Sequence, residues 1–247
     1  MLLRYLGVLG EEPLAFLVLI AAFGLSMLLG LAFHEFCHAF VANGLGDRTP
    51  AMLGRLTLNP LAHLDPIGSA LIFFVGFGWA KPVPVNPYNT KNPKTSMALI
   101  AGAGPVSNLI VAGLAAIPIK LGLVPFFHPF IAPSLAGFAA EIWTQSPETL
   151  LGLFLGTVVL LNVILAVFNF FPIAPIDGFR VLVGVLPDEL SRPLARVEPW
   201  GPGILLLLIM VPFLTRGEFN PLFDIMNPLI DFFLELFVGG GGPLEVF

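Results

Sequence analysis

The sequence predicts an all-α polytopic membrane protein with about five to six transmembrane helices. Of its 247 residues, 57% are hydrophobic and only 11% are charged, whereas a soluble domain usually carries about 25% charged residues. Several runs lack Asp, Glu, Lys and Arg and reach or exceed the roughly 17 residues that a helix needs to cross a bilayer. These runs are residues 14–33, 95–119, 121–140, 149–176 and 199–215.

The first apolar run predicts a helix over about residues 14–42. Arg4 precedes this run, as in a signal peptide, but Glu11 and Glu12 stand directly before it, and we therefore expect the helix to be retained. The segment 66–80 is also uncharged, but it is short for a membrane span and rich in glycine. This composition favours a re-entrant or β-hairpin insertion after the first helix.

The later apolar runs predict further helices in the C-terminal two thirds of the chain. They are expected at residues 96–121, 149–171, 203–214 and 219–238. The last of these is either a final span or a helix that lies in the membrane interface, and its Asp224, Asp231 and Glu235 favour the interfacial helix.

The distribution of Lys and Arg predicts the orientation of these helices. Basic residues occur in the loop 43–95 and after Phe171, whereas residues 121–148 contain none. Because cytoplasmic loops carry the excess of basic residues, we expect both basic segments on the cytoplasmic side. No basic run suggests a nucleic-acid partner, and a single cysteine, Cys37, excludes an intramolecular disulfide.

His34, Glu35 and His38 form a His-Glu-x-x-His motif at the end of the first apolar run. Side chains four residues apart share one helix face, so both imidazoles can bind one cation, with Glu35 beside that face. A zinc ion lowers the pKa of a bound water to about 7, and Glu35 could accept the proton. The alternatives are a chance pentapeptide and a histidine pair at the membrane interface.

A catalytic zinc takes a third protein ligand and leaves one position for water. His63, His128 and the acidic residues are candidates, although His128 lies in the connection that we expect to be external. Asp177 follows the cleanest span on the same predicted face as His38, within the proline-broken segment 169–178. Irregular backbone at membrane depth occurs where it is buried in protein or lines a cavity. The alternative for Asp177 is an exposed cap at a helix stop.

The two motifs, in this order, resemble those of the site-2 proteases, intramembrane metalloproteases that cut transmembrane segments of other proteins. The resemblance covers most of residues 14–180. It implies that His34, His38 and Asp177 bind one Zn²⁺ per chain. It also implies that Glu35 is the general acid/base.

The sequence departs from the usual family pattern at two positions that are not ligands. Phe36-Cys37 replaces a commoner small pair, and Phe179 stands where many members have a second glycine. No PDZ or CBS domain is recognisable, so the chain resembles the compact prokaryotic branch of the family.

Several polar residues outside the two motifs are candidates for supporting roles. Asn169 could donate to the oxyanion of the reaction or join helices. His63 could support the site, gate it, act as a fourth ligand, or bind backbone at the interface. Asn108 could support the site from a glycine-rich stretch that serves packing first, and we expect Asn162 to serve packing. Asn86 lies in a Pro-Val stretch that either contacts an unwound substrate strand or forms a rigid connector.

The resemblance implies a zinc metalloendopeptidase that hydrolyses a peptide bond in or near a transmembrane segment of a substrate membrane protein. It would be integral to a prokaryotic plasma membrane, with its active site toward the cytoplasmic side. We expect one intramembrane metalloprotease domain over residues 1–247, with a catalytic core at about 14–180 and C-terminal helices at about 200–238. A membrane metal-ion transporter and a catalytically silent membrane chaperone are the rival hypotheses, and the lack of an internal repeat disfavours the transporter.

Overall fold

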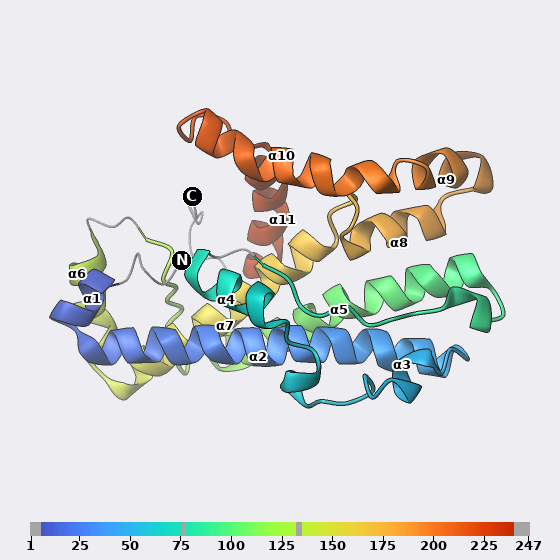
Figure 1. The fold of residues 1–247 in the computed structure, drawn as a ribbon. Helices are drawn as coiled ribbons and strands as arrows, with labels where there is room; N and C mark the ends of the chain where they lie inside the picture. The colour runs from blue at the N-terminus through green and yellow to red at the C-terminus, as the bar shows by residue number, and fades with distance from the viewer. Residues whose placement is uncertain (1–5, 76–77, 132–134, 240–247) are drawn as a thin grey trace.

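The computed structural model describes residues 6–75, 78–131 and 135–239. Helices and turns of helix follow one another along these residues (Figure 1). They are α1 (Leu6–Glu11), α2 (Pro13–Gly44), α3 (Thr49–Met52), η2 (Pro60–Ala62), α4 (Pro66–Val75), η3 (Pro87–Asn89), α5 (Pro93–Lys120), α6 (Ala136–Trp143), α7 (Pro147–Asn169), α8 (Asp177–Val185), α9 (Asp188–Ala195), η5 (Glu198–Trp200), α10 (Gly201–Leu214) and α11 (Pro221–Val238).

Three helices, α2, α5 and α7, are long and apolar enough to cross a membrane. A fourth span is present if α9 and the helical run Glu198–Leu214, which meet at a bend of 41°, count as one. The prediction of a helical membrane protein is therefore confirmed at the level of three or four candidate spans. By length, α4 with its 10 residues does not reach a full span.

The three long helices begin where their sequences favour a helix start. Proline occupies the first turn of α2, α5 and α7, where its fixed φ suits the helix and its missing N–H breaks no bond. At the start of α7, the side chains of Ser146 and Thr149 each bond the other's backbone N–H, which satisfies two amide groups that the helix leaves free. All three starts lie within three residues of the predicted ones.

The helices α2, α5 and α7 pack against one another, and α8 packs against α5. In Figure 1, α9 and α10 cross the top of the view, on the opposite side of the molecule from α2. Many large side chains of α10 are exposed, among them Leu206, Leu207, Phe213 and Leu214. This exposure fits a helix whose surface faces lipid.

The insertion after the first motif is helical where the structure describes it. Residues 66–75 form α4, and residues 76–77 lie outside the described part. The β-hairpin alternative is therefore wrong for 66–75, because an apolar run of this length forms internal hydrogen bonds as a helix. Among the described residues the only β-type pairing is an isolated antiparallel bridge between Leu64 and Ala80.

All three long helices carry buried polar side chains. Each helix contributes some of them from positions that its apolar residues surround. They are Ser26, His34, Glu35 and His38 on α2, Ser96, Ser107 and Asn108 on α5, and Thr157 and Asn162 on α7. Such groups are costly to bury without partners, and the hydrogen bonds that join His34, Asn108 and Asn162 between the helices lie at the candidate site.

Candidate metal centre

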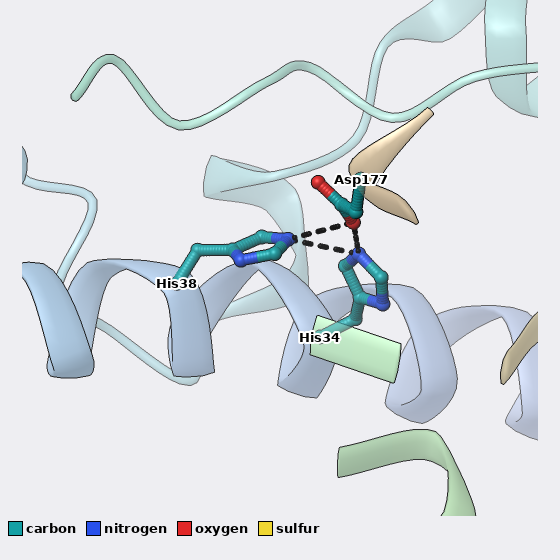
Figure 2. Close-up of side chains that lie close together, drawn as sticks. All are labelled: His34, His38 and Asp177. Carbon is teal, nitrogen blue, oxygen red and sulfur yellow. Dashed lines mark hydrogen bonds and ion pairs between the residues drawn. The ribbon is translucent and has the colours of Figure 1, made fainter. Parts of the chain in front are cut away.

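His34, His38 and Asp177 come together at one point between α2 and α8 (Figure 2). The two imidazoles lie one turn apart on α2 and point towards Asp177, the first residue of α8. His34 Nε2 lies 3.0 Å from Asp177 Oδ2 and 3.0 Å from His38 Nε2. His38 Nε2 lies 3.2 Å from the same carboxylate oxygen. No other His, Cys, Asp or Glu in the described residues joins this group.

The other nitrogen of each imidazole is hydrogen-bonded to an acceptor on α5. His34 Nδ1 lies 2.8 Å from Asn108 Oδ1, and His38 Nδ1 lies 2.6 Å from the Ile100 carbonyl oxygen. An N–H at Nδ1 is required to donate to an oxygen, so the lone pair of each neutral ring is at Nε2. Both lone pairs therefore face the carboxylate of Asp177.

This donor set fits zinc. Two nitrogen lone pairs and a carboxylate oxygen within 3.2 Å of one another repel unless a proton or a metal cation lies between them. Two histidines and one carboxylate are a known catalytic zinc set, with metal–ligand distances of about 2.0–2.2 Å. Ligands at such distances in a tetrahedron are about 3.3 Å apart, close to the observed separations. Hydrogen bonds from the distal nitrogens to fixed acceptors are the usual second support of such a site.

Asp177 owes its position to the break between α7 and α8. The chain leaves α7 at Asn169 and enters α8 at Asp177, which folds the carboxylate back over α2. Gly178 makes this return possible, because a Cβ there would lie 2.2 Å from the Phe170 carbonyl oxygen and 2.5 Å from that of Phe171. The Asp-Gly pair of the second motif is thus explained by close backbone approach.

Gly104 on α5 lies directly against the two imidazoles. A Cβ at this position would be 2.5 Å from Cε1 and Nε2 of His34 and 2.6 Å from Cε1 of His38. The sequence indicates only that small residues here let helices pack. The structure assigns Gly104 a more specific task, which is to leave space for the ligand rings.

A chain of asparagines links the ligand His34 to α7. Asn108 Nδ2 donates to the Gly30 carbonyl oxygen at 3.1 Å and to Asn162 Oδ1 at 3.0 Å, and Asn162 Nδ2 donates to the Val158 carbonyl oxygen at 2.9 Å. These bonds fix which end of the Asn108 amide faces His34. The expectation that Asn162 serves packing alone is therefore incomplete, since it orients the residue that bonds the ligand.

Glu35 lies beside the ligand group but outside it. Its side chain is buried on α2, and Oε2 accepts the backbone N–H of Val83 at 3.1 Å. The extended segment after α4 thus reaches the motif helix at the position of the candidate general base.

His63 does not join the ligand group. It is fully buried, and its Nε2 donates to the Thr57 carbonyl oxygen at 2.8 Å. A histidine bonded to backbone is one of the alternatives predicted for this residue, and the fourth-ligand alternative is not what the structure shows. His128 lies in the connection between α5 and α6, where burial lowers its pKa to about 4.

Asn86 lies at a separate cluster around Asp47. Its backbone N–H donates to Asp47 Oδ2 at 2.7 Å, and its side-chain oxygen accepts the N–H of Tyr88. Burial opposes ionisation of Asp47, but hydrogen bonds from Thr49, Asn89 and Asn86 outweigh it and hold the pKa of Asp47 below its ordinary value. Asn86 therefore anchors the chain after the Pro-Val stretch.

Asn169 ends α7, and its amide nitrogen donates to the Leu165 carbonyl oxygen at 2.8 Å. This bond lies within its own helix, and among the described residues Asn169 has no hydrogen bond to His34, His38 or Asp177.

Arg55 is a residue that the sequence gives no reason to single out, since an isolated arginine in a basic loop is ordinary. The structure buries it between two segments next to the site.

Comparison with known proteins places this arrangement in a family. The chain is 35% identical over 226 residues to "Putative zinc metalloprotease YwhC" of Bacillus subtilis, which covers 89% of this chain and 92% of that protein. It is 31% identical to "Putative zinc metalloprotease Rip2" of Mycolicibacterium smegmatis, over 99% of this chain and 83% of the relative. The Rip2 protein of Mycobacterium tuberculosis is 29% identical over 87% of this chain.

No model of a protein family matches the chain, and no solved structure matches it. The assignment therefore rests on the curated relatives, which align over nearly the whole chain, and on the convergence of both motifs at one point. On these grounds the chain belongs to the site-2 protease family.

Proposed function

We propose that this protein is an intramembrane zinc metalloendopeptidase that hydrolyses a peptide bond in or near a transmembrane segment of a substrate membrane protein. The observation that carries the proposal is the meeting of His34, His38 and Asp177 inside a bundle of candidate membrane helices. Ionisable groups are rare at such positions and are kept for function. The names of the relatives, "Putative zinc metalloprotease YwhC" and "Putative zinc metalloprotease Rip2", support the same activity.

His34, His38 and Asp177 would hold one Zn²⁺ per chain. When bound, the ion supplies a Lewis acid for the peptide carbonyl and lowers the pKa of a water to about 7. Asn108 and the Ile100 carbonyl oxygen keep both imidazoles in the tautomer that a metal requires.

Glu35 would accept the proton of the attacking water and deliver it to the leaving amine. Its burial beside the ligands and outside their group suits this task. Asn169 would donate to the oxyanion, after its amide exchanges the bond that it makes to Leu165 in the structure.

The finer membrane arrangement also belongs to the proposal. We assign crossings to α2, α5, α7 and α10, with α4 as a re-entrant helix and α11 as a helix in the membrane interface, which gives five to six membrane helices in one domain over residues 1–247. The core would span about residues 14–180 and the C-terminal helices about 200–238. Basic residues in the segments that adjoin the site support an active site toward the cytoplasmic side of a prokaryotic plasma membrane. The partners are then a transmembrane protein substrate and the lipid bilayer.

Zinc content and cleavage of model transmembrane substrates, measured on the same purified samples, test the proposal. Wild type should hold one zinc and cleave, whereas Glu35→Gln should keep the zinc and lose activity by roughly a factor of 10² to 10⁴. Asp177→Ala should bind zinc more weakly. Asp188→Ala is the matched control, because Asp188 pairs with Lys94 away from the ligand group.

Zinc that stays fully bound in Asp177→Ala would remove Asp177 from the ligand set. A wild-type protein that holds no zinc and cleaves none of a broad panel of substrates would contradict the proposal. Zinc that exchanges rapidly and moves across a vesicle membrane would favour the transporter instead.

A further inference from the structure

Arg55 is a buried cation without a carboxylate partner among the described residues. Its guanidinium is satisfied by backbone carbonyl oxygens of two separate segments. Nη1 donates to the Ala62 oxygen, and Nη2 donates to the oxygens of Lys81 and Pro82 at 2.9 and 2.8 Å. Because an uncompensated buried charge is costly, these bonds hold the two segments together firmly.

The segments that Arg55 joins are already paired with one another. Leu64 and Ala80 form an antiparallel bridge, and the Lys81 N–H donates to the His63 carbonyl oxygen at 2.8 Å. Arg55 closes the end of this short pairing, and its own N–H donates to the Pro50 carbonyl oxygen at 2.8 Å. The backbone of residues 80–82 is thereby fixed relative to the chain that follows α2.

The next residue, Val83, presents its N–H to Glu35 Oε2 at 3.1 Å. Beyond it, the Asn86 N–H is bound by Asp47, so the donor to Glu35 lies between two anchored points. Within the described residues the Glu35 carboxylate accepts no other hydrogen bond. The Val83 amide is therefore the one hydrogen-bond donor there that orients this carboxylate.

We propose that Arg55 is a positioning residue for the reaction: it fixes the backbone at Lys81 and Pro82 so that the Val83 amide holds the carboxylate of Glu35 in one orientation. The inference rests on the proposed function, in which Glu35 moves the proton. A general base has to stay within hydrogen-bond reach of the proton that it takes, and a misplacement of about 1 Å can cost a factor of roughly 10² in rate. The Val83 amide donates to one carboxylate oxygen of Glu35, and the other oxygen stays available for the proton transfer.

Removal of the amide hydrogen tests the proposal directly. Val83→Pro deletes this donor in a segment where prolines already flank the residue. We expect kcat to fall about tenfold to a hundredfold, the effect of losing one hydrogen bond to a charged group, with KM and zinc content nearly unchanged. Val85→Pro is the matched control, because the Val85 N–H has no partner among the described residues, and its loss in kcat should be at least several-fold smaller.

A double-mutant cycle then connects Arg55 to the same bond. Arg55→Lys keeps the charge but cannot bridge both segments with a planar fork, so its kcat should fall with zinc retained. In the Val83→Pro background the same substitution should change kcat by less than about twofold, since the bond through which Arg55 acts is already absent. Losses that multiply would mean that Arg55 merely supports the fold, and a Val83→Pro enzyme as active as Val85→Pro would refute the positioning role.

Amide hydrogen exchange gives a readout that does not depend on activity. In peptides that cover residues 81–86, one amide should exchange faster in Glu35→Ala, and more than one amide should exchange faster in Arg55→Lys. Unchanged exchange in both variants would overturn the inference. If wild type cleaves and Glu35→Gln does not, while Val83→Pro keeps full kcat, only the positioning role fails; if Glu35→Gln cleaves like wild type, the proposed function fails and the inference with it.

Discussion

Replacement of Gly104 by alanine tests whether the space between α5 and the ligand rings is needed for metal binding. The new Cβ would lie 2.5 Å from two atoms of the His34 ring and 2.6 Å from the His38 ring. Favourable carbon contacts require about 3.5 Å or more, so either the rings or the helix must move by about 1 Å. The Cβ would clash with ring atoms of both His34 and His38, so the substitution should disturb both rings.

The structure offers no inexpensive way to make that movement. Asn108 and the Ile100 carbonyl oxygen, which orient the two rings, are on the same helix as Gly104. If α5 retreats, both hydrogen bonds lengthen; if the rings turn away, both Nε2 atoms leave Asp177. Loss of such supporting bonds typically lowers metal affinity by about tenfold to a hundredfold, and we expect at least this loss in Gly104→Ala.

A competition titration of zinc against a chelator measures this affinity in the purified protein. Gly102→Ala, two residues away on α5, is the matched control, because its Cβ would meet only Val181 Cγ2 at 3.7 Å. Circular dichroism of both variants checks that the helices persist. Equal zinc affinity in Gly104→Ala and Gly102→Ala would refute the steric argument and with it the placement of α5 against the rings.

Two further predictions concern the network behind the ligands and the connection before α6. Asn108→Ala should weaken zinc binding by about tenfold to a hundredfold, and Asn162→Ala by less, because it orients only Asn108; equal affinities in a chelator competition would count against the network. His128 has its pKa lowered from 6.5 to about 4 by burial. The unfolded chain thus binds its proton first as pH falls, and stability should decrease from about pH 6.5 to 4. Thermal unfolding across this range should show a flatter pH dependence in His128→Gln, and an unchanged slope would contradict the burial of a neutral ring.

The long helices could be predicted from sequence because hydropathy and proline act locally. The start of α2 was expected at residue 14 and lies at Pro13, and α7 was expected from residue 149 and starts at Pro147. The two motifs could also be placed on one side, because basic residues mark both adjoining segments. The structure bears out that the end of α2 and the start of α8 meet.

The parts that sequence did not reveal depend on contacts between distant segments. Asn162 pairs with Asn108 across 54 positions, and Val83 reaches Glu35 across 48. Such contacts have no sequence pattern of their own. An asparagine in an apolar helix looks the same in the sequence whether it joins helices or orients a metal-binding histidine. Gly104 is similar: a small residue indicates close approach, but only the fold shows what approaches.

The arrangement also explains how one turn of an apolar helix tolerates three ionisable residues. A charged group would cost roughly 2.5–3.5 kcal/mol near the bilayer centre, and all three side chains have partners from other parts of the chain. His34 and His38 bond α5, Glu35 bonds the segment that Arg55 fixes, and Asp177 arrives with α8. No single partner can offset the cost alone, so the site is complete only when all of these segments have docked. Substitutions as far apart as Arg55 on a loop and Asn162 on α7 should therefore act at the same centre, one through the general base and the other through a ligand.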